Sequence, residues 1–188
     1  MLEPRCQHRA HHGCALTGQI EHRQIQRKPQ ETPCFLRFSL FLHFSGDRAC
    51  IKDYVFIGPA CGSGGMFVQT GDFVNHAGMN ANSTMTFYGQ EKVEYNAQLC
   101  LMNMTVHGLA GVIKSGDEAN TFYHDAHNLN GCCDYVMANP PFNVDKVNAE
   151  SAQSAGRLPF GLPSVNAKKE VGNGNYLWIS YFYSCLYR

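Results

Sequence analysis

The most informative short motif in the sequence is Asn139-Pro140-Pro141-Phe142, which follows an apolar run. Proline cannot donate a backbone hydrogen bond and restricts the residue before it, so the motif predicts a stiff, extended turn after a strand. The Asn139 side-chain oxygen and the Pro140 carbonyl are then two acceptors that suit an exocyclic amine with two hydrogens. Phe142 offers a flat face for stacking on a planar base, a contact worth about 1–3 kcal/mol. The alternative is a strand-ending turn with a core phenylalanine.

A second motif is the small-residue loop Ala60-Cys61-Gly62-Ser63-Gly64-Gly65, which lies between a predicted strand and a predicted helix. Glycines allow tight turning and let a ligand approach without a Cβ in the way, and the helix start offers unpaired N–H groups. The spacing is not the full G-x-G-x-x-G, and no G-x-x-x-x-G-K-[ST] occurs, so a phosphate ligand is not required. A plain turn is the alternative.

Glu91 ends the second predicted strand. An acid at this position can accept hydrogen bonds from both hydroxyls of a ribose. Together with the glycine loop, it indicates an adenosine-containing cofactor bound through its ribose. Glu91 is also a favourable acid for the first turn of a helix, and this alternative stays open.

Cysteine and histidine gather near the start of the chain, at Cys6, His8, His11, His12, Cys14 and His22. These side chains suit zinc, but their spacing lacks the two separated pairs of ligands that are typical of zinc sites. We predict no metal site. Residues 1–48 are interpreted as an atypical leader, either poorly ordered or unrelated to the domain that follows.

Apolar runs and helical spacing predict alternating strands and helices after residue 50. Strands are expected at 54–57, 84–89, near 112–113 and at 134–138, and helices from 66 onward, over 91–107 and over 176–187. The segment 34–42 fits a strand or a short helix. The alternation implies an α/β fold with a mostly parallel sheet. Ligands bind at the carboxyl ends of such strands, so we expect both special loops on one edge of the sheet.

The composition narrows the class of protein. Of the 188 residues, 44% are hydrophobic and 16% are charged, which excludes wholesale disorder. Lys+Arg and Asp+Glu both number 15, so a strongly basic DNA binder is excluded, whereas an enzyme acting on DNA is not. The nine cysteines are an odd number with no secretory signal, so we expect reduced thiols and a cytoplasmic location. No apolar stretch is long enough to predict a membrane span.

Several stretches together resemble the methylation subunit of type I restriction–modification systems, a family of S-adenosylmethionine-dependent DNA adenine-N6 methyltransferases. They are PACGSGGMFV at 59–68, FYGQE at 87–91, NTFY at 120–123, VMANPPFN at 136–143, GRLPFG at 156–161 and NYLWI at 175–179. The resemblance covers about residues 53–186. It implies a Rossmann-like methyltransferase fold, with residues 49–188 as a partial adenine-specific DNA methyltransferase domain.

The resemblance also implies residue roles. The loop residues Ala60, Gly62, Ser63, Gly64 and Gly65 would surround S-adenosylmethionine. Glu91 would hold its ribose, and Asn120 would lie near its adenine. Asn139 and Pro140 would bind the target amine, and Phe142 would stack on the base. The implied partners are DNA and the specificity and restriction subunits of a type I complex.

A mechanism follows from these roles. Adenine inside a duplex cannot reach the methyl donor, so it must be flipped out at a cost of a few kcal/mol. Acceptors at Asn139 and Pro140 favour a pyramidal nitrogen with developing positive charge. Alignment of this nitrogen with the methyl group and the sulfur of the donor supplies the remaining rate enhancement. Cys61 is interpreted as a small buried residue and not as a nucleophile.

The chain departs from the family pattern in three ways. Gly58 stands where the family usually has an aspartate that positions the cofactor's amino end. An upstream aromatic motif and helical domain are absent, and the chain stops soon after Trp178. We therefore expect an incomplete sheet and a fragment that is not active alone. The alternatives are an inactive remnant, or a methyltransferase acting on protein glutamine or RNA.

Overall fold

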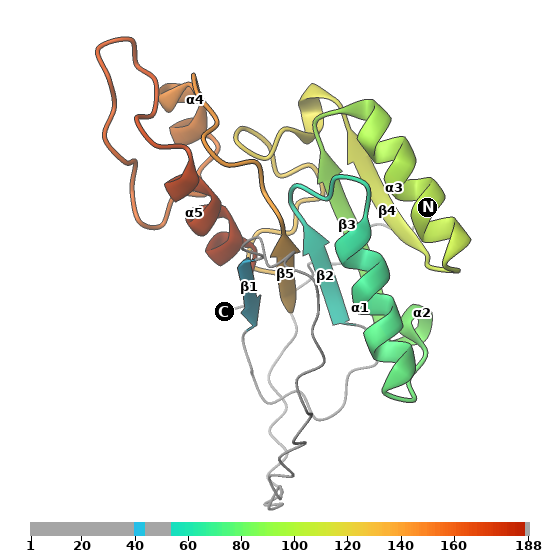
Figure 1. Cartoon of the computed structure of the whole chain (residues 1–188). Helices are drawn as coiled ribbons and strands as arrows, with labels where there is room; N and C mark the ends of the chain where they lie inside the picture. Colours follow the sequence, from blue (N-terminus) through green and yellow to red (C-terminus); the bar gives the residue numbers. More distant parts are fainter. Residues whose placement is uncertain (1–39, 44–53, 187–188) are drawn as a thin grey trace, which may run out of the picture.

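In a computed structural model, residues 40–43 and 54–186 are described, and they form a five-stranded sheet with helices on both faces (Figure 1). The strands are β1 (Leu40–His43), β2 (Tyr54–Gly58), β3 (Met85–Glu91), β4 (Gly111–Ser115) and β5 (Tyr135–Ala138). The helices are α1 (Gly65–His76), α2 (Ala81–Thr84), α3 (Glu94–Val106), α4 (Ala149–Ser154) and α5 (Asn175–Cys185), with a 3-10 turn at Asp117–Ala119.

The strand order is β1-β5-β2-β3-β4. Neighbouring strands from β5 to β4 pair in parallel, and β1 pairs antiparallel with β5. This arrangement confirms the prediction of an α/β fold with a mostly parallel sheet. Within the ambiguous segment 34–42, Leu40 to Leu42 belong to strand β1, and residues 34–39 lie outside the described part.

Alternating side chains divide the core between the two faces of the sheet, because successive residues of a strand point to opposite sides. Phe56 and Phe87 pack against Phe67 of α1, with ring centroids 5.5 to 5.6 Å apart. Ile57 and Val136 belong to a second buried cluster that contains the inner face of α5. The helices α1 and α3 therefore cover one face, and α5 covers the other (Figure 1).

The bounds of α3 and α5 differ slightly from the ranges predicted from the sequence. The helix predicted over 91–107 begins at Glu94, because Glu91 still belongs to β3 and Val93 occupies the N-cap. α5 (Asn175–Cys185) confirms the helix predicted over 176–187 but begins one residue earlier and ends two residues earlier, and its buried residues recur at helical spacing. These buried residues include Leu177, Trp178, Tyr181, Phe182 and Cys185.

The cysteine and histidine cluster of the leader lies outside the described residues, and so does most of the 1–48 segment. Within residues 40–43 and 54–186, no group of three metal-binding side chains comes together. Among the described cysteines, Cys61, Cys100, Cys133 and Cys185 are free thiols, but Cys132 is disulfide-bonded, so the expectation of reduced thiols is wrong at that position. None of the helices in the described ranges is long and apolar enough to cross a membrane.

Candidate active site

A cavity of about 260 Å³ lies at the carboxyl ends of the parallel strands. Ala60 follows β2, Glu91 ends β3, Asn120 follows β4, and Pro141 follows β5, and all four line this cavity. The prediction that both special loops meet on one edge of the sheet is therefore confirmed. Loops from four parallel strands converge here, as expected for a ligand site in an open α/β sheet.

The glycine loop is shaped by two left-handed residues. Gly62 has a φ of 56° and Gly64 a φ of 80°, a conformation that costs other residues about 1–2 kcal/mol. A Cβ on Gly64 would lie 2.7 Å from Cys100 Sγ, so only glycine lets α3 approach this closely. Of the five loop residues predicted to surround the cofactor, Ala60 alone lines the cavity, whereas Gly62, Ser63, Gly64 and Gly65 do not.

Glu91 joins the glycine loop to the start of α3. Its Oε2 accepts a hydrogen bond from the Gly62 amide at 3.0 Å, and its Oε1 accepts one from the Val93 amide at 2.9 Å. An ionised carboxylate has about four acceptor positions. The two backbone bonds therefore leave capacity for hydroxyl groups of a ligand in the cavity.

The segment Asn120 to Tyr123 forms the wall beyond Glu91. The Asn120 side-chain oxygen accepts a hydrogen bond from the Phe122 amide at 3.1 Å, which fixes a tight turn. The Thr121 hydroxyl donates to the Pro59 carbonyl, so this wall is tied to the loop that follows β2.

The proline corner lies beside the cavity and is held by α5. Asn139 is exposed and Pro140 is buried, while Phe142 is 52% exposed. None of these three residues lines the cavity, although Pro141 between them does. The Trp178 indole N–H donates to the Pro141 carbonyl at 3.2 Å, so the first turns of α5 fix the corner next to the cavity.

Several lining residues were not predicted from the sequence. Lys92 adjoins Glu91, and Asp145 and Lys146 come from the loop after the proline corner. Phe122 and Trp178 also line the cavity and pack against each other, with ring centroids 4.7 Å apart. Both aromatic residues fall within stretches that resemble the family, which was the available signal. No spacing rule pointed to Asp145 or Lys146.

Cys61 is unsuited to act as a nucleophile. It is buried, and a hydrogen bond with Cys100 together with burial raises the pKa of its thiol. Since the thiolate is the nucleophilic form, Cys61 stays unreactive at neutral pH. This agrees with the interpretation of Cys61 as a small buried residue.

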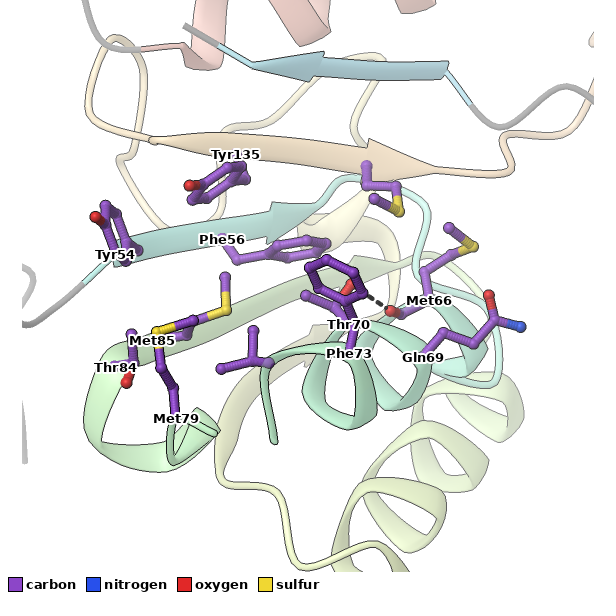
Figure 2. Close-up of a pocket in the computed structure, with 12 residues that line it drawn as sticks. Tyr54, Phe56, Met66, Gln69, Thr70, Phe73, Met79, Thr84, Met85 and Tyr135 are labelled. Carbon is purple, nitrogen blue, oxygen red and sulfur yellow. Dashed lines mark hydrogen bonds between the residues drawn. The ribbon is translucent and has the colours of Figure 1, made fainter. Parts of the chain in front are cut away.

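A larger cavity, of about 490 Å³, lies between α1 and strands β2, β3 and β5 (Figure 2). Aromatic rings and methionines project into it, and the Thr70 hydroxyl already donates to the Met66 carbonyl at 2.8 Å. Among the described residues that line it, none carries a carboxylate, ammonium, guanidinium or imidazole group. The smaller cavity therefore remains the candidate active site.

Comparisons with known proteins agree with the resemblance seen in the sequence. A family model described as N-6 DNA Methylase matches residues 48–187. The chain is 36% identical over 125 residues to the type I restriction enzyme MjaIX methylase subunit of Methanocaldococcus jannaschii, a match covering 66% of this chain and 21% of that protein. It is 33% identical over 123 residues to the type I restriction enzyme HindI methylase subunit of Haemophilus influenzae, covering 65% of this chain and 26% of that protein. The chain thus spans about a quarter or less of the length of these relatives.

Proposed function

The chain belongs to the N-6 DNA Methylase family, and on this premise we propose that it carries the cofactor and target-base sites of a DNA adenine-N6 methyltransferase. The proposed methyl donor is S-adenosylmethionine. The supporting observation is the convergence of Ala60, Glu91, Asn120 and Pro141 on one cavity, with Asn139 exposed beside it.

The residues around the cavity fit an adenosine-containing donor. Glu91 would bind the ribose hydroxyls, since two of its acceptor positions already serve the backbone and others remain. Asn120 and Phe122 would lie along the adenine, which suits a polar side chain and a flat ring. The cofactor supplies an activated methyl group, and the protein supplies orientation.

The proline corner would hold the target base. The exposed Asn139 side chain and the Pro140 carbonyl would accept hydrogen bonds from the adenine amine, which favours the nitrogen geometry needed for attack. Phe142, with half of its surface exposed, would stack on the flipped ring. Flipping is required because the amine is inaccessible inside a duplex.

The names of the relatives support a place in a type I restriction–modification complex. The proposed partners are therefore DNA, a specificity subunit and a restriction subunit. The 15 basic and 15 acidic residues leave no net charge for DNA attraction, so the partner subunits would supply much of it. A cellular DNA substrate implies a cytoplasmic location.

The direct test is transfer of labelled methyl groups from S-adenosylmethionine to DNA by the chain combined with its proposed specificity subunit. We expect Asn139→Ala to abolish transfer. The control is Asn130→Ala, another exposed asparagine, which should leave transfer unchanged. Full transfer by Asn139→Ala would contradict the role of the corner.

Phe142→Ala tests the stacking role. Loss of a stacking contact of about 1–3 kcal/mol predicts transfer about 5- to 150-fold slower at low DNA concentration. Because Phe142 is 52% exposed, the free energy of unfolding should change little. Phe142→Trp keeps a flat ring and should transfer methyl groups as fast as the unaltered chain. If Phe142→Ala were as active as the unaltered chain, the stacking role of Phe142 would be contradicted.

The alternatives have their own readouts. Calorimetric titration with S-adenosylmethionine should give micromolar affinity, whereas millimolar or absent binding favours an inactive remnant. A panel of DNA, RNA and glutamine-containing protein substrates separates a DNA methyltransferase from one that acts on another planar amine or amide.

A further inference from the structure

We infer that Arg157 is a positioning residue that fixes the cofactor-side wall of the cavity, and this inference rests on the proposed function. Arg157 is 3% exposed and lies outside the lining of the cavity. It follows α4 (Ala149–Ser154), far in sequence from the wall formed by residues 120–123. Any influence it has on a ligand must therefore pass through other groups.

The guanidinium of Arg157 holds the backbone of the wall. Its Nη2 donates to the Thr121 carbonyl, and to the His124 carbonyl at 2.9 Å. These carbonyls belong to a segment outside the strands, where no sheet ladder supplies partners. Both bonds come from Nη2, which the rigid guanidinium plane holds in place, whereas a lysine ammonium is a point charge on a flexible stem.

Tyr181 of α5 adds a third contact to the same backbone segment, and we call Arg157 and Tyr181 together the clamp. Its ring lies under the guanidinium, with Arg157 Cζ 4.7 Å from the ring centroid, and its hydroxyl donates to the Phe122 carbonyl at 2.8 Å. Burial raises the pKa of Tyr181 to about 12, so the hydroxyl keeps its proton at neutral pH. Arg157 and Tyr181 together therefore hold the carbonyls of Thr121, Phe122 and His124.

Gln90 of β3 holds the same segment from the sheet. Its Nε2 lies 3.3 Å from Thr121 Oγ1 and 3.1 Å from the His124 carbonyl, and its Oε1 accepts a bond from the Ala126 amide at 3.2 Å. Gln90 is 1% exposed and directly precedes Glu91. The wall is thus fixed relative to the acid proposed to bind the ribose.

Burying a guanidinium is costly unless its hydrogen bonds offset the loss of hydration. Arg157 Nε is buried with no hydrogen-bond partner among the described residues. An apolar side chain would fill the same space without that cost. The two carbonyl bonds and the ring contact therefore point to a specific task, which is to keep Asn120 and Phe122 at the cavity.

Two substitutions test the inference. Arg157→Met fills space of similar length but provides no donor, and Arg157→Lys provides a charge without the planar fork. We expect the affinity for S-adenosylmethionine, measured by calorimetry, to fall at least tenfold in Arg157→Met and by a smaller factor in Arg157→Lys. Leu109→Ala is the control, because it removes a buried side chain from the cluster on the other face of the sheet. It should lower thermal stability and leave the affinity unchanged.

Two independent signals report on the wall itself. The Tyr123 and His124 amides both donate to the Asn120 carbonyl, at 2.9 Å each. Their hydrogen exchange should accelerate in Arg157→Met while exchange in β3 stays the same. Trp178 is the single tryptophan of the chain and packs on Phe122, so its fluorescence should change in the same variant.

The outcomes separate the inference from the proposed function. Unchanged exchange at Tyr123 and His124 in Arg157→Met overturns the inference whether or not a ligand binds. Unchanged affinity in a folded Arg157→Met variant overturns it as well. If the unaltered chain fails to bind S-adenosylmethionine while the variant exchanges faster, the clamp stands and the cofactor assignment fails.

Discussion

Glu91 and Gly62 lie 29 positions apart in the chain, yet the Glu91 carboxylate accepts the Gly62 amide at 3.0 Å. The acid that ends β3 therefore holds the glycine loop that follows β2. The sequence offered these as two separate features of a nucleotide site. In the structure they are one hydrogen-bonded unit, so a change in either is expected to affect both.

Glu91→Ala should reduce stability as well as any cofactor binding. It removes two hydrogen bonds to a charged group, so we expect a loss of about 2 kcal/mol in the free energy of unfolding, measured by urea denaturation. Glu91→Gln keeps one acceptor and should lose less. Glu118→Ala, at an exposed acid, should stay within about 0.5 kcal/mol. A stability loss equal to that of Glu118→Ala would contradict the structural role.

Gly62 and Gly64 both have left-handed backbone conformations, so Gly62→Ala serves as the control for Gly64→Ala. Gly62→Ala meets no atom within 4 Å and should cost only the left-handed strain of about 1–2 kcal/mol. Gly64→Ala carries the same strain and also places a Cβ 2.7 Å from Cys100 Sγ, so it should be clearly less stable. Denaturation of the double variant Gly64→Ala/Cys100→Ala should show part of that extra loss recovered. Equal losses for the two single variants would show that the approach of α3 is not tight.

The family resemblance implies an aspartate where Gly58 stands, and the structure explains why introducing this acid is costly. A Cβ at Gly58 would lie 2.8 Å from Phe67 Cζ, and Phe67 is 1% exposed among other rings. We expect Gly58→Asp to lower the free energy of unfolding by about 2 kcal/mol or more. The double variant Gly58→Asp/Phe67→Leu should recover part of this loss, and calorimetry should show tighter S-adenosylmethionine binding than in the unaltered chain. No recovery in the double variant would contradict the steric explanation.

His127 should make stability depend on pH. It is buried, and its Nε2 lies 2.8 Å from the Gly89 carbonyl. Desolvation by burial, together with nearby Lys114, lowers its pKa, while the Gly89 bond and Asp125 oppose that shift. The unfolded chain therefore takes up a proton near pH 6.5 before the folded chain does. Stability from this group is complete above that pH and declines as the pH falls toward the lower folded pKa.

The measurement compares denaturation midpoints at pH 7.5 and pH 5.5. Between pH 7.5 and pH 5.5, the free energy of unfolding should fall less in His127→Gln than in the unaltered chain. The difference should be at most about 1.4 kcal/mol for each pH unit between pH 6.5 and the lower folded pKa of His127. His107→Gln, at an exposed histidine, is the control and should behave like the unaltered chain. Identical decreases in all three proteins would exclude His127 as the source.

Most of the fold was predictable because its signals are local. The apolar runs at β2 and β5 and the breaks at Pro59 and Asn139 follow from propensity and proline chemistry. The start of α3 was placed three residues early, because a strand that ends in an acid and a helix that begins with one look alike in sequence. The pairing of β1 with β5 depends on contacts between segments about a hundred residues apart, which no local pattern encodes.

Residues of the candidate site could be predicted from the sequence where they belong to a recognisable motif, and not elsewhere. Ala60, Glu91 and Asn120 line the cavity, and all three lie in stretches quoted for the resemblance. The hydrogen bond between Glu91 and Gly62 was not foreseen, since it depends on how two loops meet in space. The roles of the glycine loop and of Asn139, Pro140 and Phe142 stay predictions.

Strand β1 lies at the edge of the described sheet and keeps β5 in its interior. Its residues Leu40 to His43 pair with Ala138 to Tyr135, so the backbone of β5 is bonded on both sides. A strand with one open side is a template for aggregation through added strands. A version lacking Leu40–His43 would leave the β5 backbone groups unsatisfied directly beneath Asn139. Such a version should self-associate through β5, the strand that Asn139 follows.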